Sequence, residues 1–279
     1  TLDRSSAASD VYKRQSIINI YSRSPSLIAM GAITVDTVSN GRLILGLGTS
    51  SQPLVEDFHG SKFEKPVKRM EEYVKIIRLI FAGKTINYSG EFFTLKNFSL
   101  LIKPPRNDIP IYLAAVNQKM VELAWNVADG VIFYLRPKNE LKSTLAIMQA
   151  KKKIDASIQI ITCVHPDSEK AINRAKKTLA FYVSVGKIYR EFLASNGFEN
   201  ETKNIFEEYK KTGLKNNSEL VPESMVKELC ISGTPDECKK QLQGFYETGI
   251  NLPIIQFNPI DNVQESFDLV TSTFSEESR

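Results

Sequence analysis

The fold of this 279-residue chain is decided by residues 28–50, IAMGAITVDTVSNGRLILGLGTS. The segment reads as an amphipathic helix, a tight turn, a buried strand and a glycine-rich exit. Just before it, Ser24 and Pro25 supply a helix N-cap and a proline at the first helical position. The sequence therefore predicts a helix that begins at Pro25.

Apolar side chains recur along this helix at roughly helical spacing, at Ala29, Ile33 and Val38. We expect them to share a buried face. The pair Asn40 and Gly41 is typical of a helix end, because both residue types tolerate a left-handed backbone.

A short, fully apolar run follows at residues 43–47, as expected for a strand covered on both faces. The loop after it contains Gly46, Gly48, Thr49 and Ser50. Because α/β folds bind ligands at the carboxyl ends of their strands, this loop marks the expected place of chemistry.

The glycine pair has other interpretations. A dinucleotide fingerprint needs a third glycine and an immediate helix, but residues 49–53 read TSSQP. No Lys-Ser or Lys-Thr pair follows, so a triphosphate loop is disfavoured as well. A glycine pair that merely lets a strand turn remains open as the plain alternative.

Composition indicates a soluble globular protein, since 42% of residues are hydrophobic and 24% are charged. The net charge of +4 is spread along the chain and gives no electrostatic footprint for nucleic acid. With no secretory signal and no apolar run near the ~18 residues of a membrane span, we expect a cytoplasmic protein. Three widely spaced cysteines fit a reducing compartment without a disulfide framework, namely Cys163, Cys230 and Cys238.

Residues 1–15 are polar, lack apolar periodicity and resemble translated adaptor or vector sequence. We expect a non-native or disordered leader at 1–15 and a single domain at 16–279, with the native protein starting earlier. A natural flexible tail is the alternative.

Strand-like and helix-like segments alternate along the rest of the chain, which favours a parallel sheet. Strands are expected at 17–21, 43–48, 109–115, 131–135, 157–163 and 252–257, the last of them buried. Helices are expected at 66–82, 118–127, 138–153, 168–195, 235–247 and 262–274. A hairpin is expected over 86–101 and a helical insertion over 200–222.

As an ordered set, several motifs resemble the bacterial-luciferase-like monooxygenase superfamily. They are Arg23-Ser24-Pro25 and the segments 36–42, 45–49, 69–72, 109–115, 128–130 and 233–238. The resemblance runs from Ser16 to the C-terminus. It is nearest to the deazaflavin-dependent branch that includes methylenetetrahydromethanopterin reductase.

This resemblance implies a TIM-type (β/α)8 barrel with insertions. Barrels of the family place two strands before the segment that matches residues 16–21, and this chain lacks them. We therefore expect an incomplete barrel with about six strands, whose unpaired edges and opened core put the activity of the fragment itself in question.

The resemblance further implies an oxidoreductase that transfers hydride between coenzyme F420 (8-hydroxy-5-deazaflavin) and a small organic or pterin-like substrate, and a homodimer. Alternatives are an FMN-dependent luciferase-like monooxygenase and a catalytically silent ligand-binding barrel. The catalytic residue is unknown, because the second strand lies outside the chain. Ser50 and Ser51 stand where some relatives carry Glu.

Candidate cofactor-binding residues follow from the resemblance. Gly48, Thr49 and Ser50 are expected beneath the ring, and Ile18 and Asn19 at a strained or cis peptide bulge behind it. Backbone amides at the start of a helix are expected to hold the phosphate tail, at Ala114, Ala115, Val116, Asn117 and Gln118. An ordinary strand-to-helix turn is the alternative for that last segment.

Other polar residues carry weaker hypotheses. Arg136 and Lys138 follow a strand and either add charge near a phosphate or are solvated surface cations. His59 reads as a surface residue, and Cys163 with His165 lacks the further ligands that a metal site needs. The pair at 129–130 is interpreted as structural.

Overall fold

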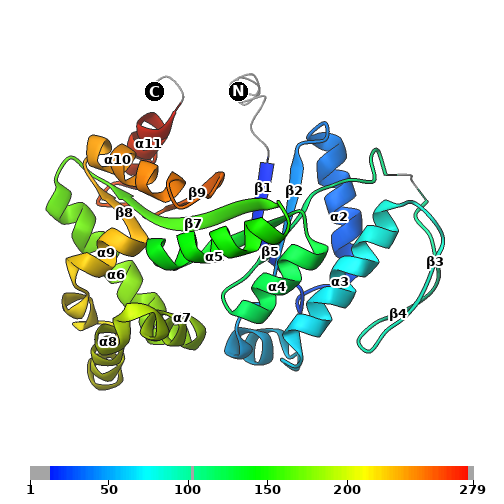
Figure 1. Cartoon of the computed structure of the whole chain (residues 1–279), viewed down its shortest axis with the longest axis horizontal. Coiled ribbons are helices and arrows are strands. Elements are labelled where there is room, and N and C mark those ends of the chain that lie inside the picture. The colour runs from blue at the N-terminus through cyan, green and yellow to red at the C-terminus, as the bar shows by residue number, and fades with distance from the viewer. Residues whose placement is uncertain (1–12, 102–103, 276–279) are drawn as a thin grey trace. The chain divides into compact units, whose positions relative to one another are not determined.

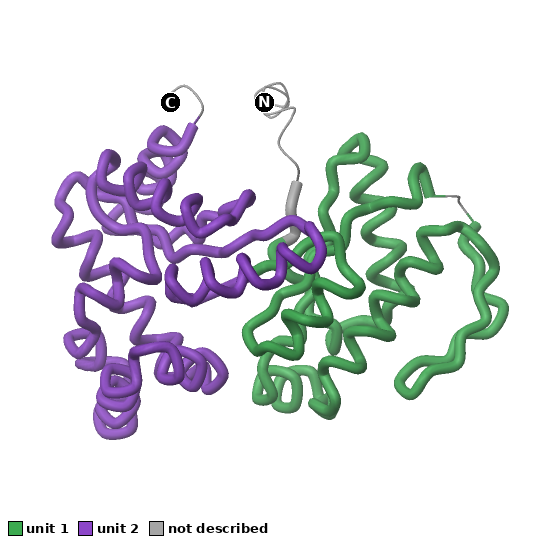
Figure 2. The backbone as a smooth tube through the Cα atoms, viewed as in Figure 1, with its two compact units in different colours: residues 1–132 green, residues 133–279 purple. Residues whose placement is uncertain are grey.

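The computed structural model describes residues 13–101 and 104–275, which form two compact units (Figure 2). Unit 1 comprises residues 1–132 and unit 2 residues 133–279. Most of the expected leader, residues 1–12, lies outside the described part of the chain. Its last residues, from Lys13, already belong to the first strand. The expectation of a single domain at 16–279 stays a prediction.

Unit 1 alternates strands and helices (Figure 1). In chain order its elements are β1 (Lys13–Asn19), α2 (Pro25–Val38), β2 (Leu43–Gly48), η1 (Leu54–Phe58), α3 (Pro66–Phe81), β3 (Ile86–Ser89), β4 (Thr94–Phe98), β5 (Ile111–Ala114), α4 (Gln118–Val127) and β6 (Gly130–Tyr134), which crosses into unit 2.

The main sheet of unit 1 is parallel, as predicted, with β2 between β1 and β5, and β5 beside β6. The register of β1 against β2 shifts between Gln15 and Ile18, so β1 carries a bulge there. β2 is buried along its whole length, which confirms the expectation for its apolar run.

Helix α2 begins as predicted, with the Ser24 side chain accepting a hydrogen bond from the Leu27 N–H. It ends before Asn40 and Gly41, which have φ angles of 54° and 77°. The expected apolar face is wrong in one position, because Val38 is 81% exposed. Its place on the buried face is taken by a carboxylate, Asp36.

Asp36 is fully buried and ties α2 to β2 and to a distant loop. Its carboxylate accepts hydrogen bonds from the Leu43 N–H at 3.1 Å and from Arg106 Nε and Nη2 at 2.9 and 2.8 Å. Burial raises the pKa of Asp36, but the Arg106 and Leu43 donors outweigh it, and the net pKa lies below its usual value.

The expected hairpin is present as β3 and β4, which pair antiparallel. Glu72 on α3 holds its turn, since its two carboxylate oxygens accept from the backbone N–H groups of Glu91 and Phe92 at 2.8 and 3.1 Å. The Glu72 side chain is therefore a structural tie between α3 and the hairpin.

Unit 2 continues the alternation and adds a group of helices (Figure 1). After β6 its elements are α5 (Lys138–Lys151), β7 (Asp155–Val164), α6 (Ser168–Val185), α7 (Lys187–Leu193), η2 (Ala194–Phe198), α8 (Glu199–Thr212), η3 (Asn217–Leu220), α9 (Glu223–Leu229), β8 (Cys230–Gly233), α10 (Pro235–Tyr246), β9 (Leu252–Phe257) and α11 (Val263–Phe274). Both β8 and β9 pair with β7 in parallel.

Three expectations for unit 2 need correction. The helix expected over 168–195 is divided at Gly186, which leaves helical geometry with ψ at 85°. The strand β8 and the helix α9 before it were not predicted. β9 is present but half-exposed throughout, whereas a buried strand was expected.

The core of unit 2 packs apolar side chains of α6 and α9 around β7 and β8. All three cysteines, which lie far apart in the sequence, are buried in this unit without disulfides. Burial raises the pKa of Cys163 to about 12, so its thiol stays protonated near neutral pH.

No helix within the described ranges combines the length and the apolar composition that crossing a membrane requires.

Candidate functional site

The strand register of unit 1 brings several predicted residues side by side. Asn19 lies opposite Gly48, and Ala114 opposite Ile132. In a parallel sheet, residues in register point to the same face. These residues therefore form one patch at the carboxyl ends of the strands. We call it the strand-end surface and define it as Ile17, Asn19, Gly48, Ala114 and Ile132.

Gly48 lies at the centre of the strand-end surface, and its small size is required. A Cβ built on Gly48 would lie 2.7 Å from Ile17 Cδ1 and 3.5 Å from Ala114 Cβ. Ile17 is 38% exposed, so this apolar side chain is accessible. Ile17 was not among the predicted residues; it lies two residues before Asn19 in β1 and so on the same face.

The two predicted residues of β1 have different places. Ile18 is in register with Leu47 and so lies on the opposite face from Gly48. Asn19 shapes the exit from the strand: its Oδ1 accepts from the Tyr21 N–H at 2.9 Å, and its carbonyl accepts from Ser22 Oγ at 2.8 Å. Among the described residues the peptide bonds are trans, and the irregularity of β1 lies between Gln15 and Ile18, just before the pair at which the bulge was expected.

Thr49 and Ser50 continue the chain beyond β2, and both are half-buried. Ser50 has a φ of 61°, a left-handed conformation that costs energy for a residue other than glycine. Strain of this kind is common in ligand-binding turns. The two hydroxyl groups place hydrogen-bonding capacity at the rim of the apolar surface.

The segment from Ala114 to Gln118 connects β5 to α4. The Ala115 N–H donates to the Ile132 carbonyl at 3.0 Å, which extends the sheet. Asn117 caps the helix, with Oδ1 accepting from the Met120 N–H at 3.0 Å. The first turn of α4 therefore begins beside the strand ends, and the positive end of its dipole favours an anion.

None of the predicted cofactor-binding residues has an ionisable side chain. Their chemistry is limited to apolar contact, hydroxyl and amide hydrogen bonds, and backbone donors. These residues supply no general acid or base.

The two cations after β6 are engaged within unit 2. Arg136 is 2% exposed, pairs with Glu140 at 3.1 Å and lies over the rings of Phe133 and Phe192. Burial lowers its pKa, and Glu140 opposes this shift. Lys138 lies over Phe245 with Nζ 4.9 Å from the ring centre. The alternative of solvated surface cations is therefore wrong.

The surroundings of the two histidines do not indicate a metal site. His59 is exposed, as expected of a surface residue. His165 Nδ1 accepts from the Asp167 N–H at 2.9 Å, and Nε2 lies 3.8 Å from Asp261. Within the described residues there is no group of three or more His, Cys, Asp or Glu placed to hold a metal ion.

The structural interpretation of residues 129–130 is confirmed. Asp129 Oδ2 accepts from the Ile111 N–H at 2.7 Å and pairs with Arg78. A Cβ on Gly130 would lie 2.7 Å from atoms of the Tyr112 ring. These contacts fix β6 against β5.

A cluster of tyrosines at the end of β6, in unit 2, was not predicted. Tyr134, Tyr182 and Tyr189 meet edge to face with ring centres 5.0 to 5.9 Å apart. Burial raises the pKa of Tyr134 and brings that of Tyr189 to about 12, so both phenols remain protonated. The signal in the sequence is faint, because Tyr182 and Tyr189 lie in α6 and α7, far along the chain from Tyr134.

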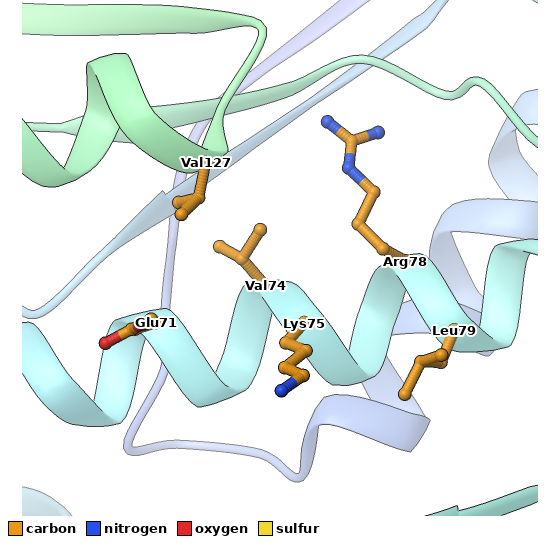
Figure 3. A pocket seen from close by; sticks show the side chains of 6 residues that line it. All are labelled: Glu71, Val74, Lys75, Arg78, Leu79 and Val127. Atoms are coloured by element: carbon orange, nitrogen blue, oxygen red, sulfur yellow. The ribbon is translucent and has the colours of Figure 1, made fainter.

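A hollow of about 360 Å³ lies on the outer side of α3 (Figure 3). Figure 3 shows Val74 and Val127 pointing toward one another, with Lys75 and Leu79 on the other side. None of the predicted cofactor-binding residues lines it. The strand register, and not this hollow, therefore locates the candidate site.

A family model for luciferase-like monooxygenases matches residues 15–252. The chain belongs to the luciferase-like monooxygenase family. The match covers both units and includes every predicted cofactor-binding residue.

Among characterised relatives, this luciferase-like chain is similar to a 5,10-methylenetetrahydromethanopterin reductase of Archaeoglobus fulgidus. The two are 29% identical over 88% of this chain and 76% of the relative. It is also 29% identical to a putative coenzyme F420-dependent oxidoreductase of Mycobacterium tuberculosis, over 91% of this chain and 81% of that protein.

Solved structures confirm the α/β fold with its parallel sheet. The coenzyme F420 dependent tetrahydromethanopterin reductase from Methanopyrus kandleri superposes with a TM-score of 0.78 at 22% identity, over 93% of this chain and 81% of the other. An F420-dependent secondary alcohol dehydrogenase, solved with an F420–acetone adduct, gives a TM-score of 0.74 at 20% identity over 96% and 80%. Whether the first two barrel strands are missing stays a prediction.

Proposed function

We propose that this luciferase-like protein is an oxidoreductase that transfers hydride between coenzyme F420 and a small organic or pterin-like substrate. The observation that carries the proposal is the strand-end surface. Gly48 and Ala114 keep it flat where the strands end, and Ile17 adds an accessible apolar side chain. A flat redox ring suits such a surface, because small residues let the face of the ring approach the backbone closely.

The residues present fit the chemical parts of a deazaflavin coenzyme. The apolar strand-end surface suits the ring, and the hydroxyls of Thr49 and Ser50 suit its polar edge. The first turn of α4, capped by Asn117, suits a phosphate. When bound, the coenzyme would supply the hydride. The residues of this chain would hold the ring, exclude water from its face and fix its orientation.

Relatives support coenzyme F420 over FMN. The two relatives above are a 5,10-methylenetetrahydromethanopterin reductase and a putative coenzyme F420-dependent oxidoreductase. A third, from Amycolatopsis mediterranei, is an F420-dependent glucose-6-phosphate dehydrogenase with 22% identity. An FMN-dependent monooxygenase is the second candidate. It is favoured by structural similarity to the monooxygenase RslO1 of Streptomyces bottropensis, with a TM-score of 0.68.

The test is a titration of the full chain with coenzyme F420 and, separately, with FMN, followed by absorbance and fluorescence. We expect a spectral change with coenzyme F420 and retention of that coenzyme in gel filtration. Retention of FMN alone would replace the proposal by the monooxygenase. Binding of neither would leave a protein without either redox coenzyme.

A matched pair of variants locates the site. Ala114→Leu adds bulk to the strand-end surface, and we expect it to weaken coenzyme F420 binding at least ~10-fold, equivalent to about 1.4 kcal/mol. Ala82→Leu makes the same change at an exposed position after α3 and should leave binding unchanged. Equal affinity in both variants would place the coenzyme elsewhere.

A further inference from the structure

The chain leaves the strand-end surface through residues 19–23, which we call the β1 exit, and helix α3 holds this segment. The Ile20 N–H donates to the Gly48 carbonyl at 3.0 Å, so the β1 exit begins in contact with the centre of the strand-end surface. At its other end, the Tyr73 hydroxyl of α3 donates to the Arg23 carbonyl at 2.6 Å. The β1 exit is therefore fixed at both of its ends.

Tyr21, in the middle of the β1 exit, is enclosed by side chains of α3 and of the segment before it, and is only 7% exposed. Its hydroxyl donates to the Glu64 carbonyl at 3.2 Å, and its ring centre lies 5.3 Å from that of Phe63. The guanidinium carbon of Arg69 lies 4.8 Å from the centre of the Tyr21 ring. The place of this ring decides the path of the chain directly after Asn19.

Arg69 is unusual because three aromatic rings surround its charge. Besides Tyr21, its guanidinium carbon lies 5.0 and 5.1 Å from the ring centres of Phe92 and Phe93, in the turn of the β3–β4 hairpin. Each ring attracts the cation through the negative charge of its face. Within the described part of the chain, however, the buried Nε of Arg69 has no hydrogen-bond acceptor. Such a donor lowers stability, so stability alone does not explain this arginine.

We infer that Arg69 is a positioning residue for the strand-end surface: it joins the β1 exit to the hairpin turn and so fixes Asn19 beside the ring of the coenzyme. Glu72 holds the hairpin turn on α3, so the rings that Arg69 contacts have a fixed place. Asn19 depends directly on the β1 exit, because its Oδ1 accepts from the Tyr21 N–H. A shift of Tyr21 therefore turns the Asn19 amide. This inference rests on the proposed function, since it concerns how the site holds coenzyme F420.

The test compares three variants of the full chain. Arg69→Met keeps the length of the side chain and removes its charge, whereas Arg69→Lys keeps the charge and removes the planar guanidinium group. Lys75→Met is the matched control. Lys75 also belongs to α3 and places its Nζ 5.8 Å from the centre of a hairpin ring, that of Tyr88. It therefore tests the contact between α3 and the hairpin without the contact to the β1 exit.

The first measurement is amide hydrogen exchange of the coenzyme-free chain. We expect residues 20–23 to exchange about 10-fold faster in Arg69→Met and at an unchanged rate in Lys75→Met. Arg69→Lys should lose less protection, because its ammonium group still faces the rings. The free energy of unfolding measured in urea should change little in Arg69→Met, since the buried Nε donor is removed together with the charge. A residue with a merely structural role would lower it.

The second measurement is a fluorescence titration with coenzyme F420. We expect a Kd about 10-fold higher in Arg69→Met and unchanged in Lys75→Met. Exchange and Kd equal to those of the unmodified chain in Arg69→Met would overturn the inference, as would equal defects in Arg69→Met and Lys75→Met. If the unmodified chain binds no coenzyme F420, the proposed function fails, whereas the exchange rates still decide whether Arg69 fixes the β1 exit.

Discussion

At the scale of single residues, some glycines are required because a neighbouring side chain leaves no room for a Cβ. At other glycines the space is open. A Cβ on Gly130 would collide with the ring of Tyr112, which is itself 1% exposed and has no room to move. A Cβ on Gly244 in α10 would meet nothing within 4 Å.

Alanine substitution at these two positions should therefore have opposite effects. Gly130→Ala overpacks the sheet and should lower the free energy of unfolding by about 2 kcal/mol. Gly244→Ala should raise it by about 0.5–1 kcal/mol, because alanine favours the helix. Urea denaturation measures both. A similar loss in the two variants would contradict the packing assigned to Tyr112.

The buried carboxylate of Asp36 predicts a pH dependence. Its pKa in the folded chain lies below the usual value of 3.8, so its ionised form stabilises the fold above that pH. This stabilisation is lost as the pH falls below 3.8 toward the folded pKa. Asp36→Asn should lower the free energy of unfolding at neutral pH by about 2 kcal/mol, through the loss of charged hydrogen bonds to Arg106.

The measurement is denaturant unfolding of both proteins between neutral and acidic pH. The difference between them should be constant at neutral pH and shrink below about pH 4. A difference that does not change on acidification would show that Asp36 is not ionised in the fold.

At the scale of elements, α10 illustrates a helix whose start is fixed by its own sequence. Thr234 and Glu237 form a capping box, in which each side chain bonds the backbone N–H of the other. Thr234→Ala should cost about 1 kcal/mol. Thr271→Ala is the control, because Thr271 is an exposed threonine within α11. Its expected effect is within about ±0.5 kcal/mol. Thermal unfolding compares them.

Elements with strong local signals could be predicted from the sequence. The bounds of α4 agree with the prediction at both ends, and α3 differs by one residue. β8 was missed because four residues carry too little periodicity to be recognised. The burial of β9 was wrong, because an apolar run reports composition and not which faces the tertiary structure covers.

Site residues could be predicted from the sequence only where the ends of the strands could be recognised. Gly48 and Ala114 were predicted to contact different parts of the cofactor, and the structure places them beside each other, because parallel strands end at one edge. Ile17 was not among the predicted residues, although strand alternation puts it on the same face as Asn19. The contact between Arg136 and Phe192 involves residues distant in the sequence, and hydrophobic periodicity cannot predict such pairs.

At the scale of the whole molecule, the two units contain different side chains that can serve as probes of their unfolding. The single tryptophan, Trp125, is in unit 1 and is 3% exposed. All three cysteines are in unit 2 and are buried. Since a buried thiol reacts only after local opening, each half of the chain carries its own probe.

Alkylation of the thiols in denaturant thus follows the opening of residues 133–279, while indole fluorescence follows that of residues 1–132. Coincident transitions would show that the chain unfolds as one cooperative unit, and separate transitions would show that it unfolds as two. A ligand that binds only to residues 1–132 should shift the fluorescence transition to a higher denaturant concentration. It should shift the thiol reaction only if the two units unfold together.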